Sequence, residues 1–342
     1  MSEETAPVAA PPDGSTDTAT FTREVEALGE RLKAARESVA RVIFGQDTVV
    51  DQTLITLLCS GHGLFIGVPG LAKTRLVHTL GTVFDLDDRR VQCTPDLMPA
   101  DILGSEVLEE DTHGHRAFRF VPGPVFAQLL MADEINRASP RTQSALLQAM
   151  QEHSVTVGGH AHPLPEPFHV LATQNPLEQE GTYPLPEAQL DRFFMEIDVG
   201  YPDRDAEREM LVATTGPDEA SPEAVMTPTQ LISAQRLVRR VPVGDQVVGT
   251  ILDLVREGRP ETSTLESVRE QVAWGPGPRA SQALMLGVRA RALMDGRTAP
   301  SVDDVVALAP PILRHRMALT FAARAEGASV DDVIAALCQP LQ

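Results

Sequence analysis

The chain has 342 residues, of which 42% are hydrophobic, and a formal net charge of −19. This length and composition predict two globular domains with a substantial core, and the acidic balance argues against general nucleic-acid binding or attachment to anionic membranes. The three cysteines, Cys59, Cys93 and Cys338, are odd in number and lack metal-site spacing, so we expect reduced thiols in a cytoplasmic protein.

The N-terminal residues 1–20 are rich in Pro, Ala, Ser, Thr and acids and contain no Lys or Arg. They lack the basic start and apolar centre of a signal peptide, and we expect a disordered tail. The most apolar stretch, residues 53–72, is interrupted by Ser60, His62 and four glycines. It predicts a helix followed by a buried strand, and therefore no membrane insertion.

Residues Gly67–Thr74 (GVPGLAKT) nearly match the phosphate-binding loop GxxxxGK[ST] between an apolar run and a helical pattern. The loop would cradle a polyphosphate with its backbone N–H groups, Lys73 would reach the β- and γ-phosphates, and Thr74 would hold Mg²⁺. Ala72 stands where glycine is usual, and we expect a helical φ there, because only a positive φ requires glycine. The predicted nucleotide-binding residues of the loop are Gly67, Pro69, Gly70, Leu71, Ala72, Lys73 and Thr74.

Two further apolar runs end in polar residues suited to nucleotide chemistry. Leu129–Ala132 ends in Asp133 and Glu134, which is the form of a Walker B strand. Asp133 is predicted to hold Mg²⁺ with Thr74, and Glu134 to orient or deprotonate the attacking water. Residues 170–173 lead into Asn175, whose amide could position the γ-phosphate and water.

Five short apolar runs, most of them separated by helical segments, predict an α/β domain with a five-stranded parallel sheet. The candidate phosphate, metal and amide residues all fall at the ends of these runs, where ligands bind in such sheets. Residues 107–120 and 154–168 interrupt the alternation and predict two β-hairpins. From Thr227 onward only helical patterns follow. We therefore predict a tail at residues 1–20, an α/β nucleotide-binding core at 21–205 and a small all-α domain at 206–342.

The order of these motifs, continued by Leu190-Asp-Arg-Phe193 and Gly277-Pro-Arg-Ala280, resembles AAA+ ATPases. The segments GVPGLAKT, ADEINRA, TQSALLQAMQE and ATQNP resemble the MoxR family in particular, and Ala72 is a trait of that family. The resemblance extends from Arg23 to the C-terminus.

This resemblance implies the roles of several residues. Asn175 corresponds to sensor 1, and Arg192 to an arginine finger that acts on the neighbouring subunit. Arg279 corresponds to sensor 2, acting from the helical lid on the nucleotide of its own subunit. Gly45 and Gln46 lie in the segment on the adenine side. Two alternatives stay open for the finger: Arg192 could form a salt bridge with Asp191 instead, and Arg137 could share or replace its role.

The resemblance also implies the activity and the partners. It predicts Mg²⁺-dependent ATP hydrolysis in a homo-oligomeric ring, a hexamer as in the family. This ring would remodel or activate a protein with a von Willebrand factor A domain. The two hairpins would face the central pore. Two other hypotheses are a nucleic-acid motor, disfavoured by the acidic charge, and a non-hydrolysing scaffold, disfavoured by Asp133, Glu134, Asn175 and Arg192 together.

Overall fold

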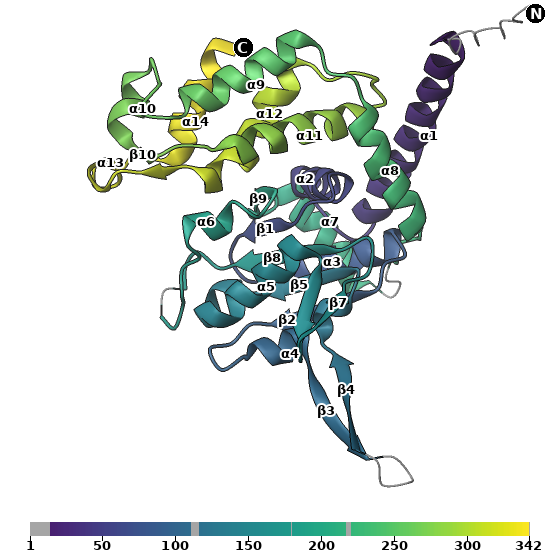
Figure 1. Ribbon diagram of the computed structural model, residues 1–342. Coiled ribbons are helices and arrows are strands. Elements are labelled where there is room, and N and C mark those ends of the chain that lie inside the picture. Colours follow the sequence, from purple (N-terminus) through teal and green to yellow (C-terminus); the bar gives the residue numbers. More distant parts are fainter. Residues whose placement is uncertain (1–13, 111–115, 179, 217–219, 342) are drawn as a thin grey trace, which may run out of the picture.

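The computed structural model describes residues 14–110, 116–178, 180–216 and 220–341. It shows an α/β core in the middle of the molecule, a helical lid on one side of it and a long hairpin projecting from the opposite side (Figure 1). Within the described residues, no helix is long and apolar enough to cross a membrane.

The core is built on a five-stranded parallel sheet, as the sequence predicted, and the structure shows its strand order to be β2-β5-β8-β1-β9. Its strands alternate with helices, so both faces are covered, and β5 and β8 are almost entirely buried. Apolar side chains on both faces explain why these strands read as continuous apolar runs. The strands are β1 (Gly63–Ile66), β2 (Asp88–Gln92), β5 (Leu129–Asp133), β8 (His169–Gln174) and β9 (Met195–Asp198).

Most of the longer helices of the core bury an apolar face, and some of the core helices begin at a side-chain cap. At α5, Ser139 accepts a hydrogen bond from the backbone N–H of Thr142, and Pro140 occupies the first helical position. The helices are α1 (Gly14–Ala40), α2 (Asp47–Leu58), α3 (Lys73–Val83), α4 (Pro99–Leu103), α5 (Pro140–Glu152), α6 (Glu187–Leu190) and α7 (Arg204–Thr215), with short 3₁₀ turns η1 (Pro124–Phe126) and η2 (Ile135–Arg137).

Both predicted hairpins are present. One pairs β3 (Gly104–Glu110) with β4 (Arg116–Pro122), and the other pairs β6 (Ser154–Val157) with β7 (His160–Pro163). The rings of Phe120 and His162 stack with centroids 3.9 Å apart, so the two hairpins contact each other. The tip of the first hairpin, residues 111–115, lies outside the described residues.

The C-terminal region is helical, as predicted, apart from one short ribbon. Its helices are α8 (Pro228–Arg240), α9 (Asp245–Glu257), α10 (Glu266–Gln271), α11 (Pro278–Met294), α12 (Val302–Leu313), α13 (Phe321–Ala325) and α14 (Val330–Cys338), with 3₁₀ turns η3 (Arg314–Arg316) and η4 (Gln339–Leu341). The strands β10 (Val272–Trp274) and β11 (Ala318–Leu319) pair antiparallel. Helices alone were expected here, because strands of two and three residues are too short to show an alternating pattern.

The predicted domain limits differ from the structure at two places. Residues 14–20, expected in the tail, are the first turns of α1, whereas residues 1–13 lie outside the described residues. The limit expected between residues 205 and 206 falls inside α7. The lid packs closely on the core, because α11 contacts α1 and α2 and α12 contacts the edge strand β9.

Candidate functional site

The phosphate-binding loop connects β1 to the first turn of α3, where the N-terminal N–H groups of the helix are free to meet an anion. Gly70 has a φ of 87° and Ala72 a φ of 55°. The expectation of a helical φ at Ala72 was therefore wrong: this alanine adopts the left-handed conformation, at a cost of about 1–2 kcal/mol for a residue with a Cβ. Such strain is typical of functional loops held in place by their surroundings.

Lys73 points back into its own loop. Its Nζ donates hydrogen bonds to the carbonyl oxygens of Gly67, at 2.5 Å, and Val68, at 3.3 Å. Partial burial lowers the pKa of Lys73, and the carboxylates of Asp133 and Glu134 oppose this effect. A polyphosphate would offer the ammonium group stronger, charged acceptors than these carbonyls.

The two Walker B carboxylates lie at the C-terminal end of β5, beside the loop. The Thr173 hydroxyl donates to Asp133 Oδ1 at 2.6 Å and accepts from the Glu134 backbone N–H at 2.8 Å. Glu134 has a φ of 54°, so the chain turns sharply between the two acids. Thr173 therefore fixes both residues, a role that the sequence analysis did not assign to it.

Two residues of β2 that the sequence analysis missed also contact these carboxylates. Arg90 donates from Nη2 to Asp133 Oδ2 at 2.6 Å, and Gln92 donates to Glu134 Oε2 at 2.7 Å. They stand two positions apart on the strand that pairs with β5, so they project from the same face. That spacing was the available signal, but it becomes informative only once β2 is known to neighbour β5.

These residues share one pocket of about 460 Å³, which is lined by Pro69, Gly70, Leu71, Ala72, Lys73, Thr74, Arg75, Arg90, Gln92, Asp133, Glu134, Thr173 and Asn175. Asn175 is buried, and its Oδ1 accepts from the backbone N–H of Leu177. The candidate metal ligands beside the loop, the Thr74 hydroxyl and the Asp133 carboxylate, would coordinate through oxygen atoms. They fit Mg²⁺, which is commonly bound through one or two carboxylates together with phosphates and waters.

A second, more apolar pocket of about 450 Å³ adjoins the loop and shares Pro69 to Ala72 with it. Gln46 lines it and donates from Nε2 to the carbonyl oxygen of Gly200. Gly45 has a φ of 63°, and a Cβ there would lie 2.5 Å from Ala206 Cβ. The opposite wall comes from α7 and the residues before it, including Tyr201 and Met210, which the sequence analysis missed. Beside a phosphate loop, this wall suits a purine ring.

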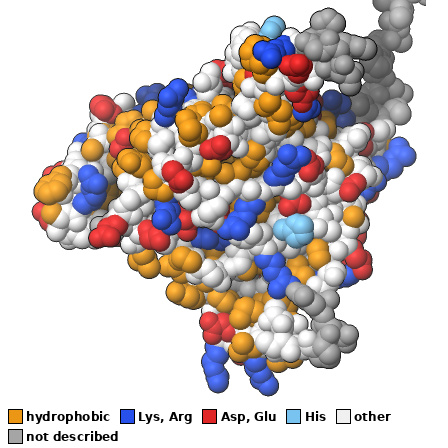
Figure 2. Space-filling model, turned by 90° about the horizontal axis from the view of Figure 1, so that it is seen from below, with side chains coloured by type: hydrophobic (Ala, Val, Ile, Leu, Met, Phe, Trp, Pro, Cys, Tyr) orange, Lys and Arg blue, Asp and Glu red, His pale blue; other side chains and the backbone are white. Residues whose placement is uncertain are grey.

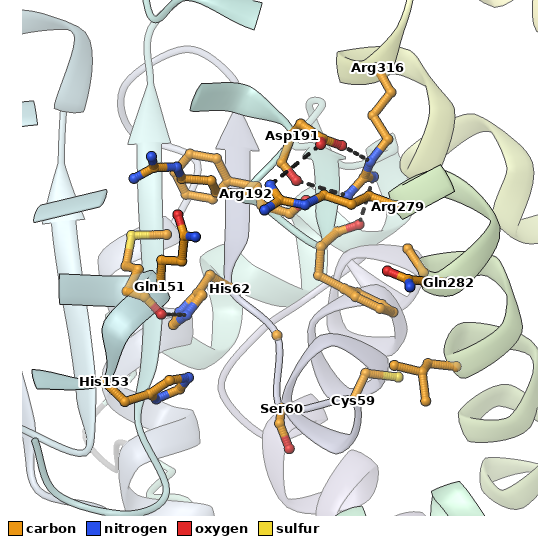
Figure 3. A pocket seen from close by; sticks show the side chains of 16 residues that line it. Cys59, Ser60, His62, Gln151, His153, Asp191, Arg192, Arg279, Gln282 and Arg316 are labelled. Carbon is orange, nitrogen blue, oxygen red and sulfur yellow. Dashed lines mark hydrogen bonds and ion pairs between the residues drawn. The ribbon is translucent and has the colours of Figure 1, made fainter. Parts of the chain in front are cut away.

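The two remaining candidates, Arg192 and Arg279, lie together in a different cleft, between the core and the lid (Figure 3). Asp191 pairs with Arg316 at 2.8 Å and with Arg279 at 3.5 Å. Among the described residues, the side chain of Arg192 forms no hydrogen bond or ion pair, so the alternative of a salt bridge with Asp191 is not observed. Arg137 instead pairs with Glu134 at 3.3 Å.

The position of Arg279 bears on its predicted role. It does not line the phosphate pocket of its own chain in the described structure, and it lies beside Arg192 instead. The cause is the packing of the lid, which places the start of α11 next to the Asp191–Phe194 segment. Action of Arg279 on the nucleotide of the same subunit stays a prediction that no contact in the described structure supports.

Comparison with protein families identified two matching regions. Residues 62–195 match the ATPase family associated with various cellular activities (AAA), and residues 265–337 match the AAA lid domain. These two regions contain the phosphate loop, both Walker B acids, Asn175, Arg192 and Arg279.

Several proteins are similar to the chain over most of its length. Chaperone MoxR1 of Mycobacterium tuberculosis is 42% identical over 304 residues, which is 89% of this chain and 80% of that protein. The Protein MoxR of Paracoccus denitrificans is 29% identical, over 85% and 89% of the two chains. A crystal structure of a protein from Cytophaga hutchinsonii superimposes with a TM-score of 0.87 at 35% identity and covers 96% of this chain and 98% of its own.

Proposed function

This chain belongs to the MoxR family of AAA+ ATPases, and on that premise we propose that it hydrolyses ATP with Mg²⁺ in a ring and thereby remodels or activates a partner protein. The observation that carries the proposal is the shared pocket of Lys73, Thr74, Asp133, Glu134 and Asn175. The proposal places the protein in the cytoplasm, where ATP is supplied.

In the proposed reaction, each side chain of the pocket has one task. Lys73 leaves the loop carbonyls and neutralises phosphate charge, while Thr74 and Asp133 would hold Mg²⁺. Bound Mg²⁺ neutralises charge on the β- and γ-phosphates. Glu134 orients the water and accepts its proton, and the Asn175 amide positions the water or the γ-phosphate. The adjoining apolar pocket, which is lined by Gln46 next to Gly45 in the chain, would take the adenine.

The ring assembly is proposed from the second cleft. Arg192 and Arg279 lie apart from the phosphate pocket of their own chain, and the Arg192 side chain has no partner among the described residues. A guanidinium aimed at a transferring phosphoryl group stabilises its developing charge. We therefore propose that both arginines act on the ATP of a neighbouring copy, in a homo-oligomer that the family resemblance suggests is a hexamer.

The partner would meet the two hairpins. The β6–β7 turn is polar and contains Gly158 and Gly159, but the first hairpin exposes Phe118 and Leu108, which pair across its strands. The first hairpin therefore exposes an aromatic side chain. The face on this side of the molecule interleaves hydrophobic and charged side chains (Figure 2). We propose local remodelling of a folded partner with a von Willebrand factor A domain, which the family resemblance implies.

The activity can be tested with the full-length protein. We expect Mg²⁺-dependent phosphate release from ATP by the wild type, unchanged by DNA. Glu134→Gln should slow it by about 100-fold or more, because the amide cannot accept a proton, while ATP binding is retained. The exposed Glu152→Gln is the matched control. Equal turnover in wild type and Glu134→Gln would refute the role of Glu134, and strong stimulation by DNA would favour a nucleic-acid motor.

The partner can be sought with the same variant. Glu134→Gln with ATP should hold the assembled state, whose size mass photometry would report, and should retain purified von Willebrand factor A proteins in a binding assay. Efficient processive unfolding of a stably folded, tagged substrate without any such protein would contradict local remodelling.

A further inference from the structure

The turn η3, which follows α12, places Arg316 at the junction of lid and core. The Arg316 side chain is 3% exposed. Nε donates to Asp191 Oδ1 at 2.8 Å, Nη2 to the carbonyl oxygen of Phe193 at 2.7 Å, and Nη1 to those of Phe194 at 3.2 Å and Ile312 at 2.6 Å. A buried guanidinium whose N–H groups are distributed in this way fixes the geometry of everything that it contacts.

These contacts surround one residue, Arg192, without touching its side chain. Arg316 holds the Asp191 carboxylate on one side of Arg192 and the carbonyl groups of Phe193 and Phe194 on the other. His315 adds a second contact to the carbonyl oxygen of Phe193 at 3.0 Å. The backbone that presents Arg192 is thus anchored to the lid, while the Arg192 side chain faces the cleft (Figure 3).

Asp191 extends this link to the second arginine of the cleft. Its Oδ2 meets Arg279 Nη1 at 3.5 Å, a longer contact than that with Arg316. The Arg279 side chain is about half exposed, whereas that of Arg316 is buried. A phosphate in the cleft would therefore draw Arg279 away from Asp191 more easily than it would disturb Arg316.

We propose that Arg316 is a positioning residue that couples the orientation of Arg192 to the position of the lid. A lid movement in one subunit would shift η3 and, with it, the Asp191–Phe194 segment. Arg192 would then move toward or away from the ATP of the neighbouring subunit. The inference rests on the proposed action of Arg192 on a neighbouring copy. The contact of Nη1 with Ile312 at the end of α12 supplies the connection to the lid.

Arg314 provides a matched control in the same turn. It pairs with Asp331 of α14 at 2.8 Å and with Asp198 of β9, so it also joins lid and core. However, it does not contact the Asp191–Phe194 segment in the described structure. Loss of Arg314 should weaken the junction without releasing Arg192.

The test is a double-mutant cycle on the full chain, with ATP hydrolysis and binding of a fluorescent ATP analogue measured for each variant. Arg316→Lys keeps the charge but cannot reproduce the planar set of contacts. We expect its kcat to fall by about 10- to 100-fold, as for a misplaced catalytic group, with ATP affinity near that of the wild type. Arg192→Ala/Arg316→Lys should be no slower than Arg192→Ala alone. Arg314→Gln should keep most of the wild-type kcat.

Multiplying losses in the double variant, or an equal loss in Arg314→Gln, would overturn the proposal. If Arg316→Lys does not fold, as judged by thermal unfolding, Asp191→Asn loosens the same contact from the core side and takes its place in the cycle. Wild-type turnover in Arg192→Ala would refute the action of Arg192 itself. If Arg192→Ala hydrolysed ATP slowly while Arg316→Lys kept the wild-type rate, only the coupling of Arg192 to the lid would be refuted.

Discussion

The phosphate pocket around Lys73 differs from the cleft that holds Arg192 and Arg279, here called the arginine cleft. The difference is in how fully the charged side chains are paired within the chain. In the phosphate pocket, Lys73 bonds loop carbonyls, Asp133 bonds Arg90 and Thr173, and Glu134 bonds Gln92. In the arginine cleft, among the described residues, the Arg279 side chain has only a 3.5 Å contact and the Arg192 side chain has no partner. The first region is complete within one chain and must rearrange when ATP binds. The second region has cations left for an anion from outside.

The comparison is tested most strongly by Arg192→Ala. We expect hydrolysis to fall on the order of 1000-fold, the lower end of the contribution of an arginine finger, with ATP binding unchanged because the residue lies outside the phosphate pocket. Phosphate release and equilibrium binding would be measured side by side. Mixed with Lys73→Ala, the variant should recover some activity. No recovery in rings shown to contain both subunits would indicate an action within one chain.

Lys73→Ala should show the opposite pattern. Loss of a charge-assisted contact of about 1.5–3 kcal/mol predicts ATP binding weaker by about 10- to 100-fold. Titration with a fluorescent ATP analogue measures this effect, and Arg279→Ala serves as the comparison from the other cleft. If Arg279→Ala weakened ATP binding by an isolated monomer as much as Lys73→Ala, the separation of the two regions would be wrong.

Acid should destabilise the folded protein through buried histidines, one of which, His62, lines the arginine cleft. His62 accepts from the backbone N–H of Val170 at Nδ1 and contacts the carbonyl oxygen of Met150 at Nε2, so it is neutral. Burial lowers the pKa of His62 to about 3 and that of His169 to about 4. Since the unfolded chain takes up these protons below pH 6.5 and the folded protein does not, stability falls as the pH drops from about 6.5 toward these values.

At pH 5 this loss amounts to about 2 kcal/mol for each histidine. Glu196 acts in the opposite direction, because burial raises its pKa to about 7 and the folded protein gains its proton first. The measurement is therefore a difference: urea unfolding at pH 7 and pH 5 for the wild type and His62→Gln. The variant should lose less stability on acidification, and the exposed His160→Gln should behave as the wild type. Equal acid sensitivity of all three proteins would exclude His62 as a source.

The smallest expected effect concerns Arg90. Its side chain is half exposed, so its pair with Asp133 contributes about 0.2–1 kcal/mol. Arg90→Gln should release Asp133 and lower the Mg²⁺ concentration needed for tight ATP binding by up to about fivefold. Arg89→Gln, on the same strand and paired with Asp87, is the control. An unchanged Mg²⁺ requirement in Arg90→Gln would show that the pair does not compete with the ion.

The sequence alone determined the sheet and both hairpins, and it indicated that the helical C-terminal region begins at Thr227. Local chemistry fixes these features: apolar runs bounded by turn residues become strands, and caps such as Thr227 with Gln230 begin helices. The motif order also brought Lys73, Asp133, Glu134 and Asn175 to one edge of the sheet, because parallel strands present their C-terminal ends on the same side.

Only the tertiary structure decided the features that depend on contacts between distant segments. The left-handed φ of Ala72 depends on the packing of the whole loop, and the contact of Arg90 with Asp133 depends on which strands are neighbours. Arg279 and Arg316 lie far along the chain from Arg192, yet they reach the same cleft because α11 and η3 pack against the segment at Asp191. Motif spacing gives the order of residues along the chain, but it does not show how the second domain packs on the first. The sequence therefore could not show which cleft these arginines occupy.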